Sequence, residues 1–166
     1  MKNKKVLGFM MVVSLLTSFF YAYNHYSAPA SQIGNIDAIM NYSMPDVIAR
    51  CQKDHNYTDE DMVILEQELK KYLALSLVTK KGDLGTGMYS TDVDNLWHSF
   101  ILFTKEYADF CDKYIGFFIH HAPETETVRS PERQEESRKD FQAFVKNYEE
   151  TFGQEIHSIW FLDMCE

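Results

Sequence analysis

The side chains best suited to chemistry lie in residues 92–123 of the chain. Asp94 and His98 are four positions apart, so on a helix they stand one turn apart on the same face. A carboxylate and an imidazole at this spacing can share a metal ion, or the carboxylate can fix the tautomer of the ring. His120 and His121 follow downstream and would join the pair if the chain turned back. These four residues are a candidate site for zinc or iron, which bind imidazole and carboxylate ligands.

Other interpretations of the same residues stay open. Their spacing matches no established ligand signature such as HExxH, so a structural role is the preferred interpretation. Asp94 would then cap or pair locally, His98 would lie between helices, and His120 would hydrogen-bond backbone carbonyls near a turn. A nucleophilic pair of Cys111 with a histidine is a further alternative. We expect Cys111 to be buried and inert, because it falls on the apolar face of its helix.

A long helix is predicted to position this stretch. Apolar residues recur at steps of three and four from Val93 to Tyr114, which predicts one continuous helix of about six turns that ends at Gly116. The residues of the stripe are Leu96, Trp97, Phe100, Ile101, Thr104, Tyr107, Ala108, Cys111 and Tyr114. A stripe of this kind is more often part of a core than a ligand platform. The segment FFIHHAP, residues 117–123, then leaves the helix.

The same stretch carries a resemblance to known proteins. Its pattern is D-x-x-W-H-x-F-x-x-x-T-x-x-Y-x-x-F-C, followed by G-x-F-I-H-H-x-P. The chain resembles an uncharacterised family of small bacterial proteins and is similar to the helical domain of plant and fungal glycine-rich domain-containing proteins, over about residues 36–161. The core of the motif is Trp97, Phe100, Thr104, Tyr107, Cys111 and Pro123. The resemblance implies that Asp94, Trp97, His98 and His120 lie together, but it implies no particular activity. The chain has no glycine-rich region.

Three further helices are predicted around the long one. Ser43 as N-cap predicts a helix to about residue 53, with Val47, Ile48 and Cys51 buried. A capping signal at residues 58–61 precedes a helix over 59–78, and Ser130-Pro131 begins a helix that ends at Gly153. The tail, residues 156–161, is predicted to fold back over a groove. No alternating strand pattern competes, so we predict an all-α fold, a compact bundle of about four helices.

The N-terminus is predicted to direct the chain to a membrane. Residues 1–5 are basic, and residues 6–22 contain no charge, which is typical of a signal peptide or of an uncleaved transmembrane helix. We therefore predict a signal or anchor over 1–22, a linker over 23–35 and one helical domain over 36–166. The domain would be exported or held by a single-pass anchor on the far side of the membrane, which is periplasmic or extracellular in a bacterium.

The net charge limits the classes of partner, and the number of cysteines limits the disulfide bonds. A net charge of −9 argues against nucleic acid or an anionic membrane surface as the main partner. Cys51, Cys111 and Cys165 are too few for a disulfide framework, and the sequence selects no pair among them. The preferred function is a non-enzymatic binding or interaction module with an unidentified protein or small-molecule partner. The alternatives are a metal-binding protein, in which an enzymatic role stays open, and a purely structural domain.

Overall fold

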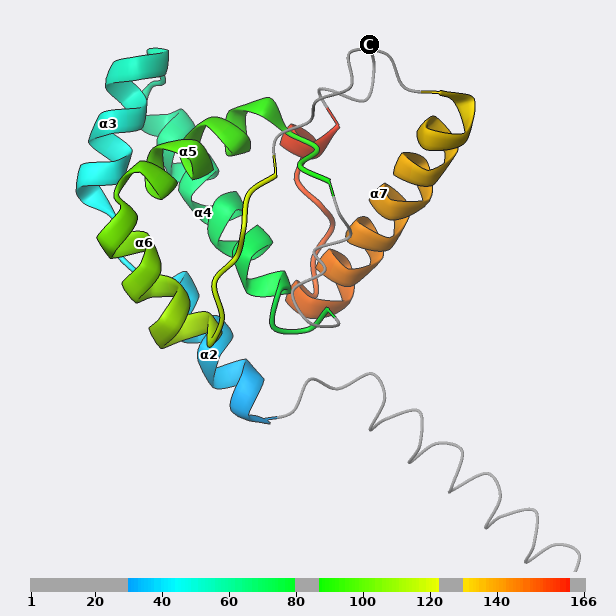
Figure 1. Cartoon of the computed structure of the whole chain (residues 1–166), viewed down its shortest axis with the longest axis horizontal. Helices are drawn as coiled ribbons and strands as arrows, with labels where there is room; N and C mark the ends of the chain where they lie inside the picture. Colours follow the sequence, from blue (N-terminus) through cyan, green and yellow to red (C-terminus); the bar gives the residue numbers. More distant parts are fainter. Residues whose placement is uncertain (1–29, 80–86, 123–129, 162–166) are drawn as a thin grey trace, which may run out of the picture. The chain divides into compact units, whose positions relative to one another are not determined.

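The computed structural model describes residues 30–79, 87–122 and 130–161 (Figure 1). In these ranges the chain is entirely helical, with six α-helices, one π-helical turn and one 3-10 turn and no strand, which confirms the all-α prediction. The α-helices are α2 (Ala30–Met40), α3 (Pro45–His55), α4 (Asp59–Leu75), α5 (Thr91–Leu102), α6 (Thr104–Phe110) and α7 (Pro131–Phe152). The short turns are η2 (Cys111–Ile115) and η3 (Ser158–Trp160).

Two of the predicted helices begin where their capping residues stand. The Thr58 hydroxyl accepts a hydrogen bond from the Asp61 backbone N–H at 3.1 Å, and the Asp61 carboxylate accepts one from the Thr58 N–H at 2.9 Å. This reciprocal pair satisfies two N–H groups that a helix leaves unpaired at its start. Ser130 caps α7 through a single bond, because its hydroxyl accepts from the Arg133 backbone N–H, and α7 ends at Gly153, whose φ of 64° favours glycine.

The first predicted helix needs a small correction. Its N-cap is Met44 rather than Ser43, and no side chain caps it. Met44 is fully buried, so it anchors the start of α3 by packing and not by a hydrogen bond. Proline follows at the first helical position, where its missing N–H costs nothing. Val47 and Cys51 are buried as predicted, whereas Ile48 is half-buried.

The long central helix is interrupted. At Phe103 the backbone leaves helical geometry, with φ of −82° and ψ of 61°, so α5 and α6 are separate helices. The break changes the direction of the apolar face: Tyr107 is buried, but Thr104, predicted to lie in the same stripe, is exposed. After α6 the chain makes the π-helical turn η2 and stops at Gly116, as predicted. The bundle therefore has more helices than the four predicted.

The sixth helix lies at the N-terminal side. Helix α2 begins at Ala30, inside the range 23–35 that was predicted to be a linker, so residues 30–35 are helical. From Gly34 onward the described residues belong to one compact unit. None of the helices in the described ranges is long and apolar enough to cross a membrane. The predicted signal or anchor, residues 1–22, lies outside the described residues.

Helix α4 is central to the packing, because it contacts α3, α5 and α7 (Figure 1). The core gathers large aromatic and aliphatic side chains from every described helix. Those that are almost completely buried include Ile39, Leu65, Leu69, Leu73, Phe100, Tyr107, Phe110, Phe144, Tyr148 and Trp160. The tail folds back, as predicted, but it fills the interior instead of covering a groove. Trp160 is 0% exposed.

A buried polar network holds the tail in the core. The Glu68 carboxylate, 2% exposed, accepts hydrogen bonds from Trp160 Nε1 at 2.7 Å and from the Tyr148 hydroxyl at about 3.0 Å. Lys71 Nζ lies 2.8 Å from the same carboxylate and supplies its counter-charge. Burial alone lowers the pKa of Lys71, but the bonds to Glu68 and Tyr148 raise it above its usual value. A buried charge paired in this way joins α4, α7 and the tail.

Candidate metal centre

The start of α5 fixes two of the predicted ligands. Ser90 accepts a hydrogen bond from the Val93 backbone N–H, which sets the first turn of the helix. Asp94 and His98 then stand one turn apart, as the spacing predicted, with His98 Nδ1 3.5 Å from Asp94 Oδ2. The His98 side chain is 50% exposed, so it lies at the surface and not in a seam between helices. The Asp94 carboxylate is more shielded, at 23% exposed.

His121, on the segment after η2, lies beside Asp94 and His98, and the three side chains form one cluster. His121 Nε2 lies 2.8 Å from Asp94 Oδ1, and its side chain is 13% exposed. The rings of His98 and His121 have centroids 4.4 Å apart at an interplanar angle of 47°. One ligand atom from each of Asp94, His98 and His121 lies within 4.8 Å of the other two.

His120 is not part of this cluster. Its ring packs against Phe118, with centroids 4.9 Å apart, and it is exposed. Burial alternates along this non-helical segment, so neighbouring side chains face different sides. Ile119 is buried, His120 is exposed, and His121 points back toward α5. Three of the four predicted ligands therefore converge.

Two aromatic residues of the motif surround His121. The edge of Trp97 packs against the His121 ring, with centroids 4.6 Å apart. Trp97 Nε1 donates a hydrogen bond to the Tyr107 hydroxyl at 3.1 Å, and that hydroxyl donates to the Ile119 carbonyl at 2.8 Å. The motif residues thus connect α5, α6 and the segment that carries His121.

Cys111 has the buried position that its place in the helix predicted. It is 1% exposed, and burial raises the pKa of its thiol, although bonds with the Ile119 backbone and Tyr107 partly offset this effect. A thiol with a raised pKa is a poor nucleophile at neutral pH. Cys51 is buried and free as well. Cys165 and Pro123 lie outside the described residues.

Asp92, a neighbouring acid on α5, binds a tyrosine instead of a histidine. The Tyr57 hydroxyl donates to Asp92 Oδ1 at 2.6 Å and accepts from Asn95 Nδ2 at 3.0 Å. Burial and the Asp92 carboxylate raise the pKa of Tyr57 to about 12, so the phenol stays protonated. Asp92 is therefore occupied in fixing the first turn of α5 to the loop before α4, two residues away from the cluster.

The spacing of the three side chains can be compared with that of a metal site. Ligand atoms about 2.1 Å from a tetrahedral ion lie about 3.4 Å from one another. The contacts of Asp94 are of similar length, 2.8 Å from Oδ1 to His121 and 3.5 Å from Oδ2 to His98, and each uses a different oxygen of the carboxylate. Without an ion, the contact between His121 and Asp94 is also a good hydrogen bond. Two imidazoles and one carboxylate form the donor set of mononuclear zinc and non-haem iron sites.

The network around Glu68 is a feature that the sequence interpretation missed. Its signal was present, because Glu68 lies three residues after Leu65 and four before Tyr72, on the apolar face of α4. A charged residue at such a position needs a buried partner. Lys71 and Trp160 are those partners. The partner on the tail is distant in sequence, so spacing alone could not identify it.

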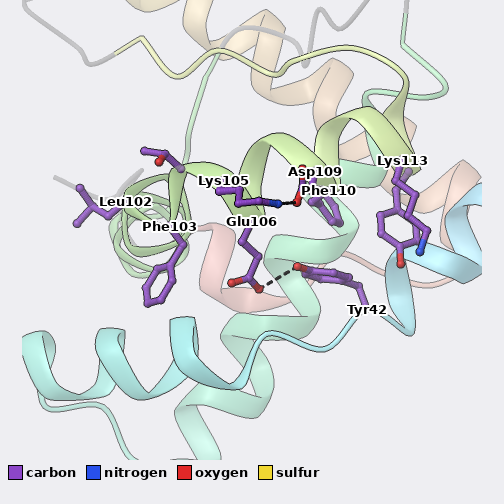
Figure 2. A pocket seen from close by; sticks show the side chains of 10 residues that line it. Tyr42, Leu102, Phe103, Lys105, Glu106, Asp109, Phe110 and Lys113 are labelled. Carbon is purple, nitrogen blue, oxygen red and sulfur yellow. Dashed lines mark hydrogen bonds and ion pairs between the residues drawn. The ribbon is translucent and has the colours of Figure 1, made fainter.

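A surface cavity of about 720 Å³ lies beside α6 (Figure 2). Tyr42 forms one wall, and its hydroxyl donates to Glu106 Oε1 at 2.9 Å. Leu102, at 67% exposed, stands at its margin. None of Asp94, His98 and His121 lines this cavity, so it is distinct from the cluster.

The protein is thus a small helical protein in which Asp94 and His98 of α5 lie beside His121 of the segment that follows η2. The chain matches the family UCP032817-like over residues 35–157 and belongs to that family. No curated protein and no solved structure matches it. The similarity to glycine-rich domain-containing proteins stays a prediction from the motif.

Proposed function

We propose that the protein binds a divalent transition metal ion, zinc or iron, through Asp94, His98 and His121. The observation that supports this proposal is the convergence of their three ligand atoms within 4.8 Å, from two segments that are separated in sequence. A hydrogen bond between Asp94 and His121 would explain the position of those two residues only. The His98 ring lies beside the His121 ring and brings a second imidazole to the same carboxylate. Among the described residues no thiolate takes part in the cluster, which favours zinc or iron over softer ions.

The exposure of the ligands supports an open site. His98 is half exposed, so an ion bound beside it would be reached from solvent. Three protein ligands leave at least one coordination position for water or another molecule, which is the arrangement of catalytic zinc and of mononuclear iron sites. Closed structural zinc sites use four protein ligands instead. The proposed site is therefore one at which an exogenous ligand can bind.

Elemental analysis of the full chain, purified without a histidine tag and dialysed, tests the proposal. We expect close to one zinc or iron per chain in the wild type. His121→Ala is expected to lose the metal, because it removes a ligand, and His98→Ala is expected to weaken its binding. His120→Ala is the matched control, since this neighbouring histidine faces away, and it should retain the metal. A wild-type protein that holds no metal and takes up none would overturn the proposal and favour a structural role.

The interaction module preferred from the sequence is a second candidate function. The cavity beside α6 supports it, because an exposed leucine and the Tyr42 ring lie there among charged side chains such as Lys105 and Asp109 and offer a mixed apolar and charged surface to a partner. The predicted export or anchoring of the chain would place this surface outside the cytoplasm. Membrane attachment through the N-terminal segment stays part of this second proposal.

Leu102→Glu tests the second candidate. The change puts a charge at the margin of the cavity, and we expect it to abolish retention of a partner by the immobilised protein. Val63→Glu is the control, because Val63 is similarly exposed, at 58%, but lies on α4. Equal retention by both variants would show that the cavity is not the binding surface.

A further inference from the structure

The segment that carries His121 is held to the helices by contacts that involve side chains. Residues 117–122 lie outside helical structure, and within the described ranges they form no backbone–backbone hydrogen bond. The position of the imidazole therefore depends on contacts made by side chains. Ile119 is the anchor, because its side chain is 4% exposed and its backbone is hydrogen-bonded by two buried residues.

Those two residues come from the helical segment that precedes the anchor. The Tyr107 hydroxyl, on α6, donates to the Ile119 carbonyl, and the Cys111 thiol hydrogen-bonds the Ile119 backbone. Tyr107 is itself held by Trp97, whose Nε1 donates to the same hydroxyl oxygen. Because Trp97 lies on the helix of Asp94 and also touches the His121 ring, one phenol hydroxyl connects both halves of the cluster.

We propose that Tyr107 is a positioning residue of the metal site. It touches no ligand atom, but its hydroxyl fixes Ile119 and thereby the distance of His121 from Asp94. This inference rests on the proposed metal binding. Residues that orient ligands without contacting the ion typically change metal affinity by about 10- to 100-fold when they are replaced. Loss of the hydroxyl should therefore weaken binding although all three ligands remain.

Zinc titration of the full chain with a competing chelator tests this inference, using wild type, Tyr107→Phe and Tyr148→Phe. Tyr148→Phe is a matched control, because Tyr148 is also buried and its hydroxyl is also hydrogen-bonded, but to Glu68, Lys71 and Gln154. Both changes remove one buried hydroxyl and keep the ring. We expect Tyr107→Phe to weaken zinc binding by about 10-fold or more, and Tyr148→Phe to bind as the wild type does.

A second measurement separates this inference from the proposed function. The NMR signals of the His121 ring in the metal-free protein should shift in Tyr107→Phe and stay unchanged in Tyr148→Phe. If wild type and variants bind neither zinc nor iron, the metal proposal is wrong, and these signals still decide whether Tyr107 positions His121. Unchanged signals, or zinc binding by Tyr107→Phe equal to that of the wild type, would overturn the positioning role. If Tyr107→Phe does not fold, Cys111→Ala replaces it, with a weaker effect in the same direction expected and an unchanged affinity counting against the inference.

Discussion

Replacement of Trp160 by alanine is expected to lower the free energy of unfolding by about 3–5 kcal/mol, the usual cost of removing a large buried aromatic side chain. Trp160 is completely buried although it is only six residues from the C-terminal end of the sequence. Its ring stacks on Tyr72 and packs edge-on against Phe144, with centroids 5.7 and 4.9 Å away. A domain is stable by only about 5–15 kcal/mol, so this loss is a large fraction of the total.

Equilibrium denaturation measures the effect, and two variants divide it into its causes. Trp160→Phe keeps most of the ring but removes the donor to Glu68, and a lost hydrogen bond to a buried charge costs about 1–3 kcal/mol. Phe161→Ala changes the adjacent, exposed residue and should have a much smaller effect. If Trp160→Ala unfolds at the same denaturant concentration as Phe161→Ala, the tail does not contribute to the core in solution.

Replacement of Asp94 by asparagine is expected to reduce metal affinity by about 100-fold or more, because it removes the only anionic ligand of the three. Asp94 contacts both histidines, so its loss also removes the group that holds them together. Asp92→Asn is the matched control. It makes the same chemical change two residues earlier on α5, where the carboxylate binds Tyr57 instead.

Thermal unfolding with and without zinc measures this second effect. A ligand at 100 times its dissociation constant stabilises the folded state by about 2.7 kcal/mol, so wild type and Asp92→Asn should melt at a higher temperature when zinc is added. Asp94→Asn should show almost no shift. An equal shift in all three proteins would place the ion elsewhere and remove Asp94 from the site.

The elements that could be predicted from the sequence are those whose boundaries are set locally. Thr58 and Ser130 cap their helices through bonds to residues three positions on, and such signals are visible in the chain itself. The break at Phe103 has no comparable signal, because the apolar periodicity continues through it. Only the packing of α6 against the rest of the core requires the turn, so the sequence predicted one helix in place of two.

In the candidate site, too, local spacing predicts some positions and tertiary contacts decide the others. The pairing of Asp94 and His98 follows from helical spacing and was predicted correctly. The choice between His120 and His121 depends on which side of a non-helical segment each one faces, and that is set by the tertiary anchor at Ile119. The sequence analysis named both histidines as candidates, but the resemblance placed His120 with Asp94, Trp97 and His98, which is wrong, because His121 is the one that lies beside Asp94 and His98.

The π-helical turn η2 has a consequence for how this family can tolerate insertions and deletions. A π-helical turn contains about one residue more than an α-helical turn, so it is equivalent to a one-residue insertion in α6. Because a π-helical turn absorbs its extra residue locally, deletion of one residue in η2 would return this turn to α-helical geometry and leave the following segment in register with Ile119's partners. His121 would then keep the side that faces Asp94, and His120 would stay exposed. The turn η2 is thus the place in this segment where a relative could lose one residue and still keep its histidine beside the aspartate of α5.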